Sequence, residues 1–557
     1  MINGKYVYGY DFGTQSCRLV LLSVPDGTIA AQEEMDYPNG VITHNLPGTG
    51  IILKNDWYLQ DPRDYIFVLE ALSKKILERT NINPGDIVAI GTAFTNCTMM
   101  PVDKEGNVLC MLDEYKNNPH SWVKLWKHHG AEAYAKEIEI YAKEHLPRLK
   151  NYGGHVSSEW LFPKILQIAR EDKELYDAAD AFIEAADWIV YKLCGNLVRN
   201  SATLGVNAFY DADEGGFPPR EFFAGIDKAI ENVVQEKLKG NVKNVGERAG
   251  NLTEEMAKAM GLTPNTVVAV GHGDSEVAAC GAGIAEAGRM IIVMGTSTCH
   301  QMMSYNKTAF DGVGAVVKDG MVPGMYAYES GQPAVGDIFE WYADNLAAEE
   351  YKEQARAKGI HLLKLMDQKA SELKAGASGL VALDWFNGNR SILMDYNLTG
   401  LIMGLTLQSK PEEIYRALIE ATAFGTRVIL DTYTENHLEI REIVAAGGLP
   451  RKSPFVAQLY ADVLNREIKV PLVNNITALG AAVCASVAAG IKNGGFDSFN
   501  EAVQMFANKE AIVYKPDKDN VKVYNRLYGV YKNLHDYFSR KQNNPMKELR
   551  NIQQSIE

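Results

Sequence analysis

Two short stretches of this chain combine glycine with hydroxyl and amide side chains, the groups that bind phosphates. They are Gly13-Thr14-Gln15-Ser16 and Gly295-Thr296-Ser297-Thr298. Each lies between two runs rich in β-branched, aromatic and aliphatic residues, which predicts the turn of a β-hairpin. Amides and hydroxyls exposed in such a turn can hold a phosphate without a basic surface. One such bend alone would be an ordinary tight turn, whereas two matching bends favour phosphate binding.

A third bend, Gly447-Gly448, ends a run that is typical of a buried strand and precedes a predicted helix. Two glycines there let a flat ring or a ribose approach the backbone closely, because no Cβ stands in the way. The three bends together predict a nucleotide site.

Asp274 is the candidate catalytic residue. It lies in TVVAVGHGDSEVAACGAG, residues 266–283, just after a predicted strand and just before a helix of small residues. Phosphoryl transfer to an alcohol needs a group that takes the proton of the attacking hydroxyl, and a carboxylate suits that role. Asp274 or Ser275 could equally cap the helix, so the residues alone leave both interpretations open.

The sequence lacks the motifs of several other nucleotide-binding classes. No G-x-x-x-x-G-K-[ST] is present, which excludes a P-loop protein, and no G-x-G-x-x-G follows a predicted strand. Asp11-Phe12-Gly13 matches the DFG letters of protein kinases, yet no H-R-D loop precedes it. The seven cysteines form no C-x-x-C pair, so neither a zinc nor a redox motif is predicted.

Composition and charge predict a folded, acidic protein. The 557 residues are 46% hydrophobic and carry a net charge of −14, which argues against a nucleic-acid partner bound through its phosphates. No apolar run approaches the ~18 residues of a membrane span, and no secretory signal pattern opens the sequence. We therefore expect a cytoplasmic protein with neither a membrane nor a nucleic-acid partner.

The spacing of the two phosphate-type bends predicts two related halves. Gly13 and Gly295 lie about half the chain apart, and two facing halves would enclose a cleft. We place the boundary near residue 285, with an N-terminal domain at 1–285 and a C-terminal domain at 286–557. Predicted helices fill the space between strands, including one over 117–145 that carries His120, His128 and His129.

Longer stretches make the chain resemble the FGGY carbohydrate kinases, the sugar-kinase branch of the actin/Hsp70/hexokinase-like superfamily. They are YKNNPHSWVKLWKHH (115–129), GGHVSSEW (153–160), GQPAVGDIF (331–339), ALDWFNGNRSIL (382–393), KPEEIYRALIEATAFGTR (410–427) and AAGGLPRKSPFVAQLYADVLNREI (445–468). Within this family the ribulokinases are the most similar group, and the resemblance covers nearly the whole chain. It implies an α/β protein with a two-lobed actin/ribonuclease-H-like fold and an inter-domain cleft.

The resemblance also implies ATP and Mg²⁺, and it gives roles to residues named above. ATP would be bound mainly by the second domain and the sugar mainly by the first. In this family an Asp that follows a strand-glycine segment is the general base, which here is Asp274. The Asp that matches Asp11 lies near the metal and the phosphates. The implied nucleotide-binding residues are Gly13, Thr14, Gln15, Gly295, Thr296, Gln332, Gly336, Gly447 and Gly448.

The implied sugar pocket contains Asn96, Asn207, Asp274 and Glu329, and here the chain departs from the ribulokinase pattern. That pattern usually has a smaller side chain at Asn96, a Lys at Asn207 and a His at Glu276, while Glu329 keeps the family's acid. A Lys is a charged donor, whereas Asn offers weaker donors and an acceptor. Glu276 adds a carboxylate near the base and is expected to raise the pKa of Asp274.

Several functions stay open at this point. The resemblance implies ATP-dependent phosphorylation of a ketopentose, with L-ribulose to L-ribulose 5-phosphate as the first choice. The altered pocket leaves D-ribulose, xylulose, erythrulose or a polyol as alternatives, because one lost polar contact changes discrimination strongly. A non-metabolic ATPase of the actin/Hsp70 kind would share the two bends but would not need the polar sugar pocket. The expected partners are ATP and a small sugar, and a homodimer is left open.

Overall fold

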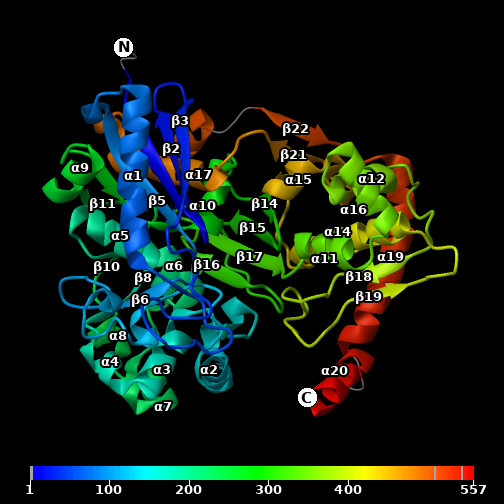
Figure 1. Ribbon diagram of the computed structural model, residues 1–557, viewed down its shortest axis with the longest axis horizontal. Coiled ribbons are helices and arrows are strands. Elements are labelled where there is room, and N and C mark those ends of the chain that lie inside the picture. Colours follow the sequence, from blue (N-terminus) through cyan, green and yellow to red (C-terminus); the bar gives the residue numbers. More distant parts are fainter. Residues whose placement is uncertain (1–3, 507–509, 541–543, 557) are drawn as a thin grey trace.

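The computed structural model describes residues 4–506, 510–540 and 544–556. Figure 1 shows a two-lobed molecule, with one large β-sheet in each lobe and helices around both. Each of these sheets has seven strands, and a four-stranded sheet, β4-β7-β6-β8, belongs to the N-terminal lobe. The chain is therefore the α/β protein that the sequence predicts.

The N-terminal sheet begins with the first predicted hairpin. β1 (Tyr6–Phe12) and β2 (Ser16–Ser23) pair antiparallel. β3 (Ile29–Asp36) adds a further antiparallel strand, and β5 (Ile87–Phe94) lies parallel to β1. The order is β11-β12-β5-β1-β2-β3, and β13 pairs with the end of β5. The remaining strands of this sheet are β11 (Arg248–Asn251), β12 (Val267–Ala269) and β13 (His272–Gly273).

The C-terminal sheet repeats this arrangement. β14 (Arg289–Met294) and β15 (Thr298–Ser304) form the second predicted hairpin, and β17 (Tyr326–Gln332) follows antiparallel. β20 (Glu442–Ala446) lies parallel to β14. The order β3-β2-β1-β5-β12 thus matches β17-β15-β14-β20-β21, with the same strand directions, so the predicted similarity of the two halves is confirmed. The other strands are β16 (Ala315–Lys318), β21 (Ile468–Pro471) and β22 (Ala511–Tyr514).

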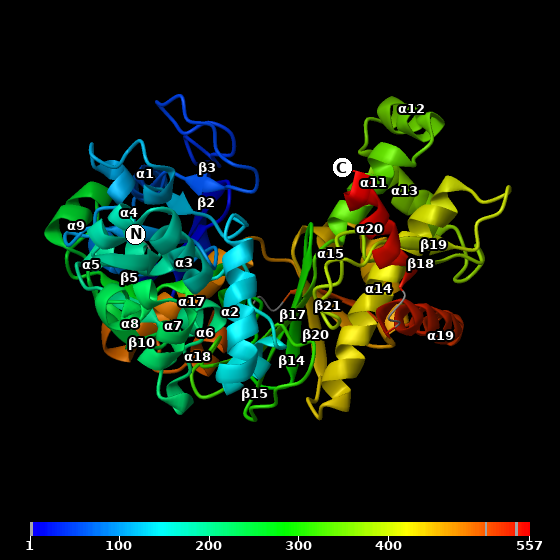
Figure 2. The same ribbon diagram turned by 90° about the horizontal axis from the view of Figure 1, so that it is seen from below.

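Helices cover both faces of the N-terminal sheet. α1 (Pro62–Thr80) receives the hydroxyls of Tyr8 and Tyr10, which donate to its backbone carbonyls, so alternate residues of β1 face this helix. α5 (Ala185–Cys194) packs on β5. On the opposite face, α10 (Asp274–Gly281) and α17 (Ile476–Ala489) lie between the two sheets, as Figures 1 and 2 show.

Residues 476–506 differ from the expected domain assignment, because α17 packs on β1 and β5 and α18 (Phe499–Phe506) packs on α17. Two glycines permit this packing. A Cβ at Gly9 or Gly91 would come within 1.9 Å of a backbone oxygen of α17. The boundary near residue 285 stays a prediction, and the packing returns this late segment to the first sheet.

The outer face of the C-terminal sheet is covered by α14 (Pro411–Glu435) and α16 (Pro454–Leu464), against which α19 (Lys518–Arg540) packs. α14 begins at Pro411, as its sequence predicts. The other helices of eight or more residues are α2 (Glu132–His145), α3 (Leu161–Glu171), α11 (Gly336–Asn345), α12 (Glu349–Lys358), α13 (Leu362–Ser371) and α20 (Pro545–Ile556).

The prediction of one helix over 117–145 is wrong. The segment forms a 3₁₀ turn at Pro119–Ser121, a short strand β7 (Val123–Lys124) and then α2. Pro119 opens the turn, and the chain pairs Val123–Lys124 into the four-stranded sheet, so tertiary pairing overrides the helical spacing. The three histidines consequently share no helix, and within the described residues no group of three or more His, Cys, Asp or Glu side chains could hold a metal ion.

Candidate active site

Asp274 lies at the edge of the N-terminal sheet where parallel strands end. It is the first residue of α10, and the N-cap of that helix is Gly273. Because β13 pairs with the carboxyl end of β5, and β5 runs parallel to β1, Asp274 shares this edge with Asp11 near the end of β1. Ligands of α/β proteins bind at such edges, so the position suits a reacting group.

The two aspartates interact electrostatically. Burial and the charge of Asp11 raise the pKa of Asp274 well above its ordinary value, and Glu276 adds to this effect, in the direction expected from the sequence. Burial also raises the pKa of Asp11, while Arg18, whose Nη1 lies 3.3 Å from Asp11 Oδ2, opposes that rise. A proton or a cation at this edge would relieve the repulsion between the carboxylates.

The first bend is a fixed turn whose residue Gln15 is exposed to solvent. The Gly13 amide donates to the Ser16 carbonyl at 3.0 Å, which closes the turn. Trp126 Nε1 donates to the Thr14 hydroxyl at 3.1 Å, and Gln60 donates to the Thr14 carbonyl at 2.8 Å. Gln15 is exposed. The bend therefore presents a fixed hydroxyl and a free amide side chain directly after Asp11.

The second bend connects β14 to β15 and contacts the start of α11 through backbone hydrogen bonds. The Gly295 amide donates to the Ser297 carbonyl at 2.9 Å. The Gly336 amide in turn donates to the Gly295 carbonyl at 3.0 Å, and the Val335 amide donates to the Thr296 carbonyl at 2.7 Å. A Cβ at Gly336 would lie only 2.5 Å from that Gly295 oxygen. The structure thus brings Gly295, Thr296 and Gly336 into one cluster.

Gly447 and Gly448 extend this cluster. Gly447 follows β20 with φ of 95°, in the left-handed region that favours glycine, and Gly448 opens the short α15 (Gly448–Lys452). A Cβ at Gly447 would lie 2.3 Å from the Met294 carbonyl oxygen. Both glycines therefore lie beside the end of β14, next to the second bend.

Gln332 is placed differently from the other nucleotide candidates. Its side chain is buried, and its amide nitrogen donates to Asp384 Oδ2 at 2.7 Å and to the Thr422 carbonyl at 2.9 Å. Its amide oxygen accepts from the Thr426 hydroxyl at 2.9 Å. The Gln332 side chain therefore hydrogen-bonds to α14 and to Asp384 in the interior of the C-terminal lobe. It stabilises this lobe and does not face the second bend.

On the sugar side, Asn96 joins the loop after β5 to α10. Its amide nitrogen donates to Glu276 Oε2 at 2.6 Å and to the Ser275 hydroxyl at 3.2 Å. Burial, with the charge of Glu329, raises the pKa of Glu276 to about 7. Glu329 itself accepts from Arg390 Nη2 at 2.7 Å and from Gln301 Nε2 at 3.4 Å.

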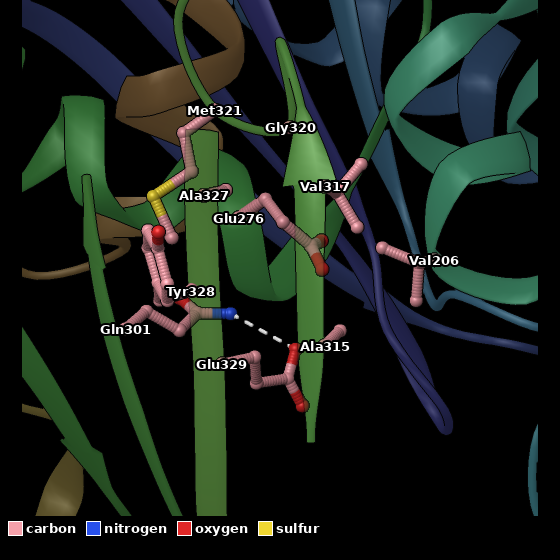
Figure 3. Close-up of a pocket in the computed structure, with 10 residues that line it drawn as sticks. All are labelled: Val206, Glu276, Gln301, Ala315, Val317, Gly320, Met321, Ala327, Tyr328 and Glu329. Carbon is pink, nitrogen blue, oxygen red and sulfur yellow. Dashed lines mark hydrogen bonds between the residues drawn. The ribbon is translucent and has the colours of Figure 1, made fainter. Parts of the chain in front are cut away.

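Glu276 and Glu329 line a small cavity between the lobes. Figure 3 shows both carboxylates pointing into it, with Gln301 donating to Glu329. The cavity has a volume of about 10 Å³. Its other walls are mostly apolar and come from Val206, Ala315, Val317, Gly320, Met321, Ala327 and Tyr328.

Asn207 lies deeper than its neighbours in the predicted pocket. It is fully buried at the end of α6 (Ser201–Asn207), and its amide nitrogen donates to Glu184 Oε1 at 3.1 Å. Its amide oxygen is buried without a hydrogen-bond partner in the described residues. Asn207 therefore contacts the protein interior through its nitrogen, and only its oxygen is left for a ligand.

Lys164 and Arg390 are charged residues that the sequence did not single out. Lys164 is fully buried on α3, and its ammonium donates to the Cys97 carbonyl at 2.6 Å and the Leu125 carbonyl at 3.0 Å, so it holds the loop that carries Asn96. Burial lowers its pKa to about 8. In the sequence, the position of Lys164 within the apolar run LFPKILQI could have indicated a buried charged residue. Arg390 belongs to the stretch ALDWFNGNRSIL, but its partner Glu329 is distant in sequence.

Family models match both halves of the chain. The FGGY family of carbohydrate kinases, N-terminal domain, matches residues 6–281, and the C-terminal domain of the same family matches residues 290–489.

Among the helices of the described residues, none combines the length and the apolar character needed to cross a membrane.

Curated relatives resemble the chain over nearly its whole length. Proteins named ribulokinase from Anoxybacillus flavithermus (strain DSM 21510 / WK1) and Geobacillus thermodenitrificans (strain NG80-2) are each 46% identical over 98% of this chain and 97% of their own. A ribulokinase from Mycolicibacterium smegmatis is 41% identical over 99% of this chain and 97% of its own.

Solved structures share the fold at lower identity. A gluconate kinase from Lactobacillus acidophilus superposes with a TM-score of 0.78 at 19% identity, covering 97% of this chain and 99% of its own. A xylulose kinase from Rhodospirillum rubrum superposes with a TM-score of 0.77 at 22% identity, and the match covers 96% of this chain and 100% of that one. Identities this low show the two-lobed fold alone.

Proposed function

Since this chain belongs to the FGGY family of carbohydrate kinases and is thus an ATP-dependent sugar kinase, we propose that it phosphorylates L-ribulose to L-ribulose 5-phosphate. The choice of sugar rests on the relatives that carry the name ribulokinase and match almost the full chain. The choice of reaction at a hydroxyl rests on the geometry around Asp274.

One observation carries the proposal: Asp274 and Asp11 lie together where parallel strands end, the first glycine-threonine bend directly follows Asp11, and the matching hairpin of the C-terminal sheet carries the second bend. Asp274 takes the proton of the attacking sugar hydroxyl. Its raised pKa suits this role, because a carboxylate that favours the protonated form accepts a proton more readily.

The nucleotide is held mainly by the C-terminal lobe. The second bend, with Gly295 and Thr296, and the adjoining Gly336, Gly447 and Gly448 bind ATP through close approach of the backbone, while the amides of Gly295 and Gly336 hold the bend together by donating to carbonyls within it. Thr14 and Gln15 of the first bend face the phosphates from the other lobe, with Gly13 keeping that turn tight. The Gln332 side chain stabilises this lobe from within.

Asp11 fits a magnesium-binding role. Asp11 Oδ2 lies 3.3 Å from Arg18 Nη1, while Oδ1 has no ion pair with a side chain among the described residues, and burial disfavours an uncompensated charge on this carboxylate. Mg²⁺ binds proteins through one or two carboxylates together with substrate phosphates and water, so a larger cluster is not required. Bound there, Mg²⁺ would neutralise charge on the phosphates during transfer.

The sugar is held by Asn96, Asn207 and Glu329 around Asp274. Asn96 and Glu329 are tied to charged neighbours, which fixes their orientation. Asn96, Asn207 and Glu276 are also the positions at which the resemblance implied other residues in a ribulokinase. This departure favours one second candidate within the same chemistry, namely a kinase for another ketose or a polyol such as D-ribulose, xylulose or erythrulose.

A coupled assay for ADP tests the proposal with L-ribulose, D-ribulose, both xyluloses, erythrulose and pentitols. The highest kcat/KM on L-ribulose is the expected result. A higher kcat/KM on another neutral sugar selects the second candidate. ADP release that no sugar stimulates would overturn both and would favour a non-metabolic ATPase of the same fold.

The domain limits, compartment and assembly state also stay proposals. We propose an N-terminal domain mainly for sugar and a C-terminal domain mainly for ATP, a cytoplasmic location, and a homodimer. Light scattering that gives twice the chain mass of 61.6 kDa would support the homodimer.

A further inference from the structure

One carboxylate oxygen of Glu276 lacks a hydrogen-bond donor among the described residues, and the residue lines a small cavity. The residue is 3% exposed, and its Oε2 accepts a hydrogen bond from the Asn96 amide nitrogen at 2.6 Å. Oε1 is buried and has no hydrogen-bond partner among the described residues. A buried carboxylate oxygen without a donor is costly, so a donor from outside the protein would stabilise it.

The direction of that free oxygen is set by the protein. Asn96 holds Oε2, and Figure 3 shows the carboxylate of Glu276 pointing into the small cavity that Glu329 enters from the other side. Glu329 is itself held by Arg390 and Gln301. Two oriented acceptors therefore meet in one space, with mostly apolar walls around them.

The size of the cavity limits what can enter it. Its volume of about 10 Å³ is that of roughly one water-sized sphere. A hydroxyl group fits, whereas a phosphate or a carboxylate is larger. A second anion would also be repelled by the two carboxylates, while an O–H donates to either of them.

We propose that Glu276 is a specificity-determining residue of the sugar site, where Oε1 accepts a hydrogen bond from one substrate hydroxyl that enters the cavity beside Glu329. Asn96 acts as a positioning residue that fixes this oxygen. The site then takes a neutral ketose or polyol and rejects sugar acids and sugar phosphates. This inference rests on the proposed sugar-kinase function and names its substrate class.

The test compares Glu276→Gln with Glu286→Gln, which removes the same charge at an exposed position ten residues later. Gln has a single carbonyl oxygen, which the Asn96 amide would occupy, so an NH₂ group would replace the acceptor in the cavity. Glu276→Asp is the second variant, because it keeps an acceptor but withdraws it by one methylene. Calorimetry measures binding of the neutral sugar and, separately, of a non-hydrolysable ATP analogue.

For Glu276→Gln we expect the sugar Kd to rise roughly 10- to 100-fold, because this change corresponds to the loss of one hydrogen bond to a charged group. The Kd of the ATP analogue should stay within twofold, and Glu286→Gln should match the wild type. Monodeoxy sugars refine the test. One of them should bind the wild type at least tenfold more weakly than its parent, yet bind Glu276→Gln nearly as well as the parent does.

The outcomes separate this inference from the proposed function. If the wild type phosphorylates a neutral sugar but Glu276→Gln and Glu276→Asp bind that sugar as tightly as the wild type, the inference is overturned and the kinase function stands. The inference would also be overturned if removing each hydroxyl raised the sugar Kd by the same factor in the wild type and in Glu276→Gln. If the wild type prefers an aldonate, the neutral substrate class is wrong. If no sugar stimulates ADP release, the proposed function fails first.

Discussion

The amide nitrogen of Asn96 donates a hydrogen bond of 2.6 Å to Oε2 of Glu276, a residue 180 positions later. This contact ties the loop after β5 to the helix that begins with Asp274. Both side chains are positions at which the resemblance implied a different residue, and here they form a donor and acceptor pair. The scaffold around this contact is that of the FGGY family, whose two domain models match residues 6–281 and 290–489.

Asp274→Asn should remove nearly all turnover. The amide is nearly isosteric but cannot take a proton, and general-base catalysis contributes about 10²- to 10⁴-fold in rate. We expect kcat to fall by at least that range, measured by a coupled ADP assay, with a thermal midpoint that does not fall, because the neutral amide removes the repulsion from Asp11. Asp113→Asn, at an exposed site, is the matched control. Full sugar-dependent ADP release by Asp274→Asn would remove the residue from the mechanism.

Gly336→Ala should weaken ATP binding without affecting the sugar. The added Cβ would lie 2.5 Å from the Gly295 carbonyl oxygen and would displace the second bend. We expect the KM for ATP to rise by about tenfold, since misplaced phosphate contacts cost at least one hydrogen bond. Gly529→Ala is the control, because nothing lies within 4 Å of its Cβ. An unchanged KM for ATP would argue against phosphate binding at this bend.

Gly9→Ala should destabilise the whole molecule. Its Cβ would come 1.9 Å from the Ala478 carbonyl oxygen, so α17 would have to move away from β1. Overpacking of this kind costs about 1–3 kcal/mol or more, and the thermal midpoint should fall by several degrees. Gly50→Ala has no neighbour within 4 Å and should melt like the wild type. Equal melting of the two variants would mean that α17 does not pack on the first sheet.

Lys124→Met should stabilise the protein, and more so at lower pH. Lys124 is fully buried, its ammonium has no hydrogen-bond partner in the described structure, and burial with nearby Lys164 lowers its pKa well below the usual range. The native state thus holds fewer protons at this site than the unfolded chain. Wild-type stability therefore rises with pH up to the unfolded pKa of about 10.4.

Melting curves at pH 6, 7.5 and 9 test this. The thermal midpoint of Lys124→Met should exceed that of the wild type by a few degrees at pH 6, because the buried amine must lose its proton on folding. The difference should shrink toward pH 9. Lys104→Met, at an exposed position, should show no such trend. A gain that grows with pH would contradict a lowered pKa of Lys124 in the folded state.

Local sequence was sufficient for the elements whose residues touch each other along the chain. The hairpins around Gly13 and Gly295, the start of α14 at Pro411 and the bend at Gly447 all appear as predicted. Hairpin turns and helix caps depend on residues within a few positions, so a single sequence carries their signal. The wrong helix over 117–145 failed for the opposite reason, because Val123 and Lys124 pair with strands from elsewhere.

The sequence by itself determined the family, the two similar halves and the candidates Asp11 and Asp274, since each depends on a contiguous motif. Only the tertiary structure decided which of these side chains meet. It showed that Gln332 faces inward, that α17 returns to the first sheet, and that Asn96 holds Glu276, which lines one small cavity together with Glu329. Contacts between residues far apart in the chain depend on packing and burial, which leave no short-range signature in the sequence.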